Sequence, residues 1–274
     1  MPPSVDKLLR TAHRQISVGD FGQAEDICRD VLSRFPKNKK ARQLYQKLKT
    51  PPQVIIDKLI GLYNTDRLKE TIKFGQALAT KFPNSPILYE ILGAANLGLE
   101  NTSETIAVYK KLLRLNPKHV DAFNNLGMVF YKQGDFARSV ENYEKAVELE
   151  PGFADAHYNL ANAFKQTDRL RKAIESYRQA LAINPDDADF LTSYGDSLKS
   201  YGLLDQAIEC YAKLLKINPD SPSIQAEIDN ATEQKTEFNK VFNIFIKNGE
   251  DKLSHAELKF FEGAVYNIMG YKEL

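Results

Sequence analysis

The chain has 274 residues, 43% of them hydrophobic, which is enough for a sizeable core in one large domain or two small ones. Lys and Arg number 37 against 36 Asp and Glu, and a formal charge of +1 gives no overall field for collecting nucleic acid. The two cysteines, Cys28 and Cys210, lie far apart, which argues against a disulfide framework and a thiolate metal site.

The sequence also argues against membrane insertion and export. No stretch approaches about 20 apolar residues, and the first residues, MPPSVDKLLR, lack the apolar run of a signal peptide. We therefore expect a cytoplasmic protein that does not insert into a membrane. The charge is uneven, since residues 1–50 hold 11 basic and 5 acidic side chains, a net charge of +6. Such an excess is typical of a solvated helix face, and contact with an acidic partner is the alternative.

Residues 1–49 precede the regular part of the chain. Some of their small and apolar positions match columns that recur later, namely Ala12, Ala24 and Val31. The segment 38–49 predicts an extra helix, which Thr50-Pro51-Pro52 ends. We expect residues 1–49 to form an N-terminal cap, a degenerate repeat plus an extra helix, at an angle to the rest that the sequence does not set.

A period of 34 residues governs the middle of the chain. Prolines recur at that interval, at Pro83, Pro117, Pro151, Pro185 and Pro219. A column of small residues reads Gly93, Gly127, Ala161 and Gly195. A second column of small residues reads Thr105, Ser139, Ala173 and Ala207. An aromatic column reads Tyr109, Tyr143, Tyr177 and Tyr211. The columns predict five repeats over residues 53–219.

Each repeat contains two stretches with helical apolar spacing, as at 123–130 and 136–147. A polar step such as Gly134-Asp135 separates them, and the proline ends the second helix because it lacks an N–H. Gly or Ala in the small columns lets the two helix axes approach to about 8 Å, and the tyrosines fill the gap against the following repeat. The predicted fold class is all-α, an array of antiparallel helix pairs.

After Pro219 the pattern weakens, and residues 220–274 are predicted to form C-terminal capping helices. Ile224 and Ile228 suggest one more first helix, followed by an aromatic stretch and a break at Asn248-Gly249. A capping box and an apolar face then predict a last helix through Ser254, Glu257, Leu258, Phe261, Val265 and Ile268. This tail covers the last repeat, forms a homodimer interface or opens a further domain; the sequence leaves all three open.

The small and aromatic columns and the closing prolines resemble the tetratricopeptide repeat (TPR) family, and the resemblance covers at least residues 53–219. It implies a right-handed superhelical solenoid in which the first helices of the pairs line a concave groove. The stretch FADAHYNLANAFKQTDRLRKAIESYRQALAINP is similar to repeats of O-linked N-acetylglucosamine transferases and of bacterial TPR proteins. Those transferases grip an extended peptide backbone with an asparagine ladder. Asn125 and Asn159 keep the ladder residue here, whereas Ile91 and Ser193 depart from it.

The sequence contains no motif that points to catalysis. It lacks a Gly-rich phosphate loop, paired histidines at metal spacing and a nucleophile elbow. The four histidines stand in different repeats or caps, and His157 is interpreted as a surface or groove residue rather than a metal ligand. We therefore expect no catalytic residue, no metal site and no cofactor, and a protein that is not an enzyme.

The resemblance places a candidate peptide-binding groove on the first helices of the central repeats. Asparagine carries both a donor and an acceptor, so it can pair with a peptide group in both directions. The candidate groove residues are Asn124, Asn125, Tyr158, Asn159, Asn162, Lys165 and Lys199. A first-turn column adds Asp121, Asp155 and Asp189, which either complement the helix dipole or contact the ligand.

The carboxylate clamp, another groove type of this family, is not predicted. Its positions here hold Glu90, Ala94, Asn125, Asp155 and Asn159. A single one of them fits, and the acids would repel a terminal carboxylate. We predict a scaffold that binds a protein or an extended peptide and not nucleic acid.

A second hypothesis for the function is a targeting or substrate-recruiting module of a larger bacterial enzyme. Repeats of this kind are often fused to sulfotransferase, glycosyltransferase, methyltransferase or oxygenase domains. Whether the natural reading frame continues past Leu274 distinguishes the two hypotheses.

Overall fold

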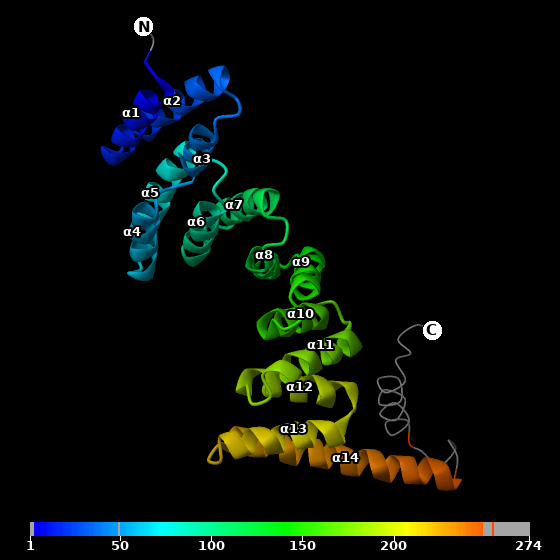
Figure 1. The fold of residues 1–274 in the computed structure, drawn as a ribbon. Helices are drawn as coiled ribbons and strands as arrows, with labels where there is room; N and C mark the ends of the chain where they lie inside the picture. Colours follow the sequence, from blue (N-terminus) through cyan, green and yellow to red (C-terminus); the bar gives the residue numbers. More distant parts are fainter. Residues whose placement is uncertain (1–2, 49, 249–253, 255–274) are drawn as a thin grey trace. The chain divides into compact units, whose positions relative to one another are not determined.

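The structure, a computed structural model, describes residues 3–48, 50–248 and 254. In this part of the chain every regular element is an α-helix (Figure 1), which confirms the predicted all-α class. The chain divides into two compact units, residues 1–122 and 123–274. The division falls within a helix, and the domain ends inferred from the sequence, at residues 49 and 219, stay predictions.

The first unit begins with two helices and a third that packs on the second. Its helices are α1 (Val5–Ser17), α2 (Phe21–Arg34), α3 (Lys39–Leu48), α4 (Gln53–Asn64), α5 (Leu68–Lys81), α6 (Pro86–Gly98), α7 (Thr102–Leu115) and the start of α8 (Val120–Lys132). α1 packs with α2, α4 with α5, and α6 with α7. α3 packs on α2 and corresponds to the extra helix that the segment 38–49 predicts.

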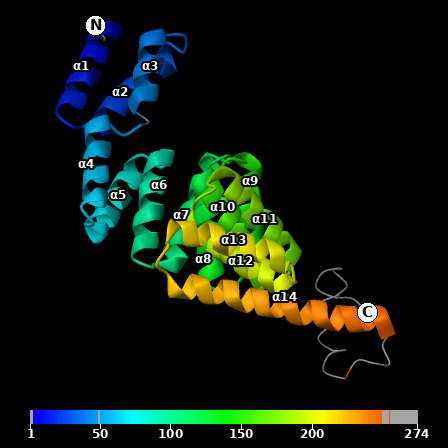
Figure 2. The same ribbon diagram turned by 90° about the horizontal axis from the view of Figure 1, so that it is seen from below.

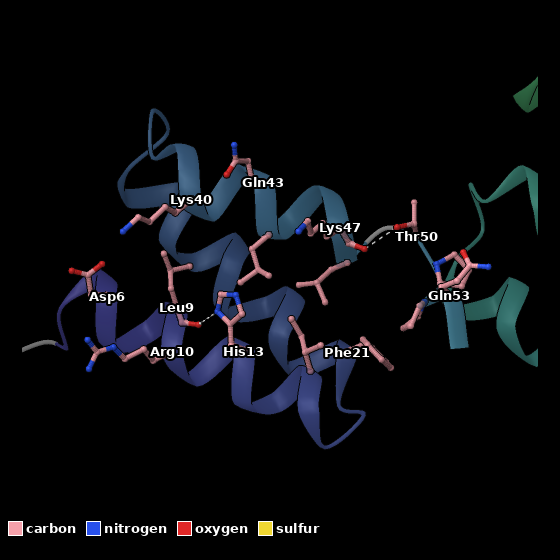
Figure 3. A pocket seen from close by; sticks show the side chains of 15 residues that line it. Asp6, Leu9, Arg10, His13, Phe21, Lys40, Gln43, Lys47, Thr50 and Gln53 are labelled. Atoms are coloured by element: carbon pink, nitrogen blue, oxygen red, sulfur yellow. Dashed lines mark hydrogen bonds between the residues drawn. The ribbon is translucent and has the colours of Figure 1, made fainter. Parts of the chain in front are cut away.

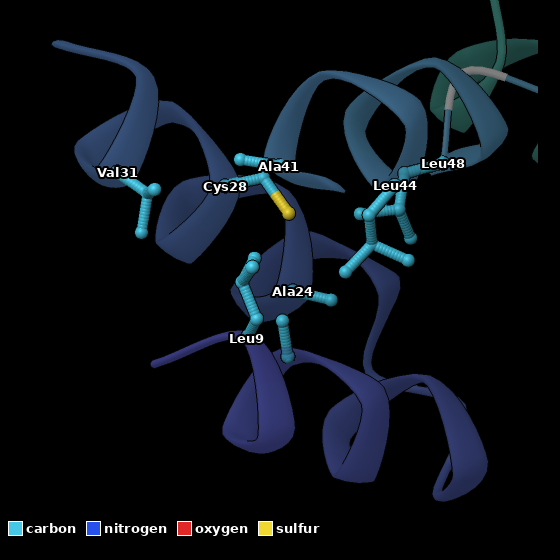
Figure 4. Close-up of a cluster of buried hydrophobic side chains, with 8 residues drawn as sticks. Leu9, Ala24, Cys28, Val31, Ala41, Leu44 and Leu48 are labelled. Carbon is cyan, nitrogen blue, oxygen red and sulfur yellow. The ribbon is translucent and has the colours of Figure 1, made fainter. Parts of the chain in front are cut away.

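The core between α1, α2 and α3 is small and apolar (Figure 4). Ala12 on α1, Ala24 and Cys28 on α2, and Ala41 on α3 are fully buried. Small side chains let the three helices approach closely, and Leu44 fills the remaining space. Residues 3–48 therefore form a packed element with a hydrophobic core of its own.

The second unit holds the rest of α8 and the helices that follow it. These are α9 (Phe136–Leu149), α10 (Ala154–Gln166), α11 (Leu170–Ile183), α12 (Ala188–Tyr201), α13 (Leu204–Ile217) and α14 (Pro222–Asn248). α14 is one continuous helix of 27 residues, which packs on α13 and extends beyond it (Figures 1 and 2). The break expected at Asn248-Gly249 falls at the limit of the described residues and stays a prediction. The predicted last helix, with Phe261, Val265 and Ile268, lies outside the described residues.

The small and aromatic columns meet inside each repeat. Tyr143 is 2% exposed, and a methyl group built on Gly127 would lie 2.6 Å from its ring carbon Cε1. The Ser139 hydroxyl donates to the Gly127 carbonyl oxygen at 2.9 Å, which ties α9 to α8. Tyr143 also belongs to a cluster with Leu160 and Ala161 of the next repeat. The prediction that Gly127 sits at a crowded helix crossing is confirmed.

The turn after each first helix uses a left-handed residue. Glycine takes this place at Gly19, Gly134 and Gly202, where φ is positive. Elsewhere Asp66, Glu100 and Asp168 adopt the same backbone conformation. Glycine reaches it without the Cβ clash that L side chains meet there. Aspartates at the helix starts complete the turns, as where Asp135 accepts from the Arg138 N–H at 3.0 Å.

Candidate functional site

The predicted groove residues Asn124 and Asn159 contact each other. The Asn159 side-chain amide on α10 donates to the Asn124 side-chain oxygen on α8 at 3.2 Å. Both side chains are half-buried, and so is Asn125, the next residue on α8. This hydrogen bond joins two first helices through residues that are 35 positions apart in the chain. The two amides therefore lie on one continuous surface.

Tyr158 makes the next connection along the same surface. Its hydroxyl lies 3.2 Å from the Ser193 hydroxyl on α12. Its ring stacks on Phe190 with 4.7 Å between centroids and meets Tyr177 at 5.7 Å. These contacts hold the ring in place, so Tyr158 presents a positioned rather than a mobile hydroxyl.

Lys199 continues the series from α12 to α14. Its ammonium pairs with the Glu227 carboxylate and lies 5.9 Å from the centre of the Tyr211 ring. The Lys199 side chain is 21% exposed, and the Glu227 carboxylate compensates its charge. Lys165 on α10 is exposed.

We call the side chains that link the first helices in this way the polar strip. It consists of Asn124, Tyr158, Asn159, Ser193, Lys199 and Glu227. Its residues stand on α8, α10, α12 and α14, helices that follow one another in Figure 1, and all of them belong to the second unit. It offers amide and hydroxyl groups in its centre and a compensated ion pair at one end, a composition suited to neutral polar groups.

Asn162 has a different place from the one expected of a groove residue. Its side-chain oxygen accepts from the Tyr177 hydroxyl at 2.5 Å. Asp196, one repeat later, accepts from the Tyr211 hydroxyl at 2.7 Å. Burial raises the pKa of Tyr177 and Tyr211, so both hydroxyls stay protonated at neutral pH and donate. Asn162 therefore helps to fix the aromatic column.

The three first-turn aspartates lie at helix starts, where a negative charge complements the helix dipole. Asp155 and Asp189 are exposed in the first turns of α10 and α12. Asp121 is exposed in the part of α8 that belongs to the first unit. The N-cap of α12 is Asp187, which accepts from the Phe190 N–H at 3.0 Å. This placement agrees with aspartates that complement the helix dipole. Contact of these aspartates with a ligand stays a prediction.

The sequence reasoning missed three participants of this surface. Ser193 looked like a departure from an asparagine ladder, yet its hydroxyl meets Tyr158. Phe190 supports the Tyr158 ring, and Glu227 pairs with Lys199. A signal in the sequence could have revealed these partners, namely an offset of 35 residues, one repeat plus one. Asn124 and Asn159 are separated by this offset, and so are Tyr158 and Ser193.

In the described ranges, no group of three or more His, Cys, Asp or Glu side chains is arranged to hold a metal ion. None of the helices in that part of the chain is long and apolar enough to cross a membrane.

The comparisons with known families agree with the helix pairs and their columns. Family patterns described as "Tetratricopeptide repeat" match residues 124–188 and 166–226, and one described as "TPR repeat" matches residues 99–134. Residues 99–226 therefore contain tetratricopeptide repeats. A search of curated protein sequences finds no significant match.

Solved structures show the same fold. MamA, residues 41 to the end, from Desulfovibrio magneticus RS-1 superposes with a TM-score of 0.57 at 20% identity, covering 62% of this chain and 96% of MamA. YrrB, described as a TPR protein with an unusual peptide-binding site, gives 0.55 at 20% identity, covering 65% of this chain and 90% of YrrB. Another crystal structure of MamA gives 0.50 at 25% identity, covering 69% and 96%. The resemblance to O-linked N-acetylglucosamine transferases finds no support in these matches and stays a prediction.

Proposed function

We propose that this TPR protein binds an extended peptide segment of a partner protein along the polar strip and catalyses no reaction itself. The observation that carries the proposal is the pair of bonds from Asn159 to Asn124 and between Tyr158 and Ser193. Both connect neighbouring first helices, so the polar groups form a row and not isolated surface residues. YrrB supports the proposal at the level of the fold, since a structure of this kind carries a peptide-binding site.

The spacing of the row suits an extended chain. Neighbouring helices pack at about 8–10 Å, and an extended peptide advances about 3.3 Å per residue. Successive first helices then meet about every third peptide residue. Each asparagine amide has two N–H donors and an oxygen with two lone pairs. Asn159 uses one donor on Asn124, which leaves capacity to pair with a peptide group.

The charge of the strip indicates which peptides fit. Lys199 is paired with Glu227, and the central residues are neutral. The residues of the strip itself hold no uncompensated cation, so a terminal carboxylate or a phosphate would find no counter-charge among them, whereas a neutral backbone finds donors and acceptors. We therefore infer recognition of peptide groups inside a segment rather than of a charged terminus. Localisation in the cytoplasm stays a prediction from the sequence.

The test uses the full chain and a displayed library of random peptides. Peptides selected on the parent protein are measured by fluorescence anisotropy against the variant Asn124→Ala, Asn159→Ala. A net hydrogen bond contributes about 0.5–1.5 kcal/mol, so losing two should weaken binding about tenfold or more. The matched control is Asn142→Ala on α9, whose amide donates to the Arg138 carbonyl oxygen four residues earlier. Equal affinity in the parent and the double variant would remove the strip from the site.

A further inference from the structure

A groove separate from the polar strip lies in the first unit, between α1 and α3 (Figure 3). We call it the N-terminal groove. It has a volume of about 990 Å³, and Thr50, Pro51, Pro52 and Gln53 close one end. Its other lining residues come from α1, the first residue of α2, and α3. The groove therefore belongs to the packed element of residues 3–48 and to the turn that follows it.

The inner surface of this groove is apolar. Leu9, Leu44 and Leu48 line it and are about 5–6% exposed, because they also close the core beneath. Ile16 and Phe21 are half-buried and line it as well. Apolar surface held in a concave site is typical of a place where a partner's apolar side chains are taken out of water.

The rims of the groove carry positive charge at helical spacing. Lys40 and Lys47 on α3 stand seven positions apart, two turns of one helix face or about 10 Å. Arg10 lies on α1 across the groove, and Asp6 is the single acid among the lining residues (Figure 3). His13 also faces the groove, and its Nδ1 donates to the Leu9 carbonyl oxygen at 2.8 Å. In the neutral ring this leaves Nε2 as an acceptor.

The cations of α2 differ from those on the rims. Arg29 pairs with Glu25 and Asp26, and Arg34 pairs with Asp30. Arg10, Lys40 and Lys47 form no ion pair with any other described residue, and α3, with the sequence KKARQLYQKL, contains no acid at all. The groove lining therefore carries a net positive charge, three cations against Asp6, whereas Arg29 and Arg34 of α2 are paired with acids.

We propose that the N-terminal groove binds an acidic amphipathic helical segment of a partner protein. The apolar side chains of that segment, at i, i+3, i+4 and i+7, would lie on Leu9, Leu44 and Leu48. Carboxylates on its flanks would meet Lys40 and Lys47 on one side and Arg10 on the other. Two features indicate this occupant: the positive charge of the rims and the apolar inner surface of the groove, which we call its floor. The polar strip has neither feature.

The floor also separates a protein segment from other anionic ligands. A nucleic acid binds through phosphates and stacked bases, and the floor is aliphatic apart from Phe21. An anionic membrane surface presents a plane of headgroups, whereas the apolar residues here lie inside a groove between two helices. A helix with acidic flanks uses both the floor and the rims.

The experiment measures binding of designed helical peptides to the full chain by fluorescence anisotropy. The probe is a labelled peptide with leucines at i, i+3, i+4 and i+7 and glutamates on both flanks. One control peptide has the glutamates replaced by lysines, and another has the leucines replaced by serines. The protein variant is Lys40→Glu, Lys47→Glu. Its matched control is Lys37→Glu, Lys39→Glu, which changes the net charge equally at exposed positions that do not line the groove.

We expect the acidic peptide to bind and both control peptides to fail. The Lys40→Glu, Lys47→Glu variant should weaken binding at least tenfold, the Lys37→Glu, Lys39→Glu control less than threefold, and added salt should weaken it further. The variant Asn124→Ala, Asn159→Ala should bind the probe like the parent, so this proposal and the polar strip fail separately. Failure of the acidic peptide to bind, equal loss in both charge variants, or preference for single-stranded RNA or phosphatidylserine vesicles over the peptide would overturn the proposal.

Discussion

Replacing Gly127 by alanine places a methyl group against the ring of Tyr143. The new Cβ would lie 2.6 Å from Cε1, 2.7 Å from Cδ1 and 2.9 Å from Cζ, whereas ordinary contacts begin at 3.4 Å. The ring must therefore move by nearly 1 Å, and at 2% exposure it is surrounded by packed side chains. Overpacking of this kind costs about 1–3 kcal/mol, and alanine returns up to about 1 kcal/mol in helix propensity.

The expected net loss is about 1 kcal/mol in the free energy of unfolding, toward the low end of the overpacking range. Ala161 takes the place of the column glycine opposite Tyr177, which shows that the column can be built around a methyl group. Urea unfolding followed by far-UV circular dichroism measures the loss. Gly61→Ala is a control, since no atom lies within 4 Å of its added Cβ and only the propensity gain remains.

A double-mutant cycle separates the clash from other effects within the same unit. In a Tyr143→Leu background the ring is gone, so Gly127→Ala should become neutral or stabilising. A coupling of about 1 kcal/mol or more between the two positions would support the crossing geometry. If Gly127→Ala is as stable as the parent protein in both backgrounds, the packing described for the column is wrong.

Further predictions concern the backbone, a buried hydroxyl and the thiols. Gly134→Ala should lower the free energy of unfolding by about 1 kcal/mol, because φ is positive there while nothing lies within 4 Å of the added Cβ. Gly152→Ala is the control, also in open space but without positive φ, and should be neutral in the same urea titration. Ser139→Ala should cost about 1 kcal/mol by leaving the Gly127 carbonyl without its hydroxyl donor, and the exposed Ser33→Ala should cost almost nothing. Burial raises the pKa of Cys210 to about 11 and also raises that of Cys28, so both thiols should react slowly with a disulfide reagent at pH 8 and faster as the pH rises towards 11. Fast reaction of the folded protein at pH 8 would contradict the raised pKa of both thiols.

The pairing of helices was predictable because the residues that set it recur. Pro117 and Pro151 mark successive repeat ends, and Gly127 with Tyr143 marks a crossing that the structure bears out. These features are local or lie within one repeat, so spacing alone reveals them. The continuity of α14 was not foreseen, because Ile224 and Ile228 suggested a short first helix, although no glycine or proline interrupts residues 223–248.

The candidate site was predictable only as a surface. Side-chain partners depend on rotamers and on offsets between repeats, which composition and columns do not contain. Asn162 illustrates the limit, because its position in the groove column gave no sign that its oxygen accepts from Tyr177. Lys199 looked like a free groove cation, whereas Glu227 on α14 pairs with it. The N-terminal groove was missed because the charge excess was visible but the apolar floor between α1 and α3 was not.

Site-specific photo-crosslinking tests the binding of a peptide along the polar strip most directly. A benzoylphenylalanine in place of Lys165, exposed on α10, should crosslink to the peptides selected from the library. The same photo-reactive residue in place of Arg171, exposed on α11, should not. We expect the crosslink at position 165 to disappear when unlabelled peptide competes and to weaken in the Asn124→Ala, Asn159→Ala background. Crosslinking at position 171 and not at 165 would place the peptide on the other helices of the repeats and contradict the proposed site.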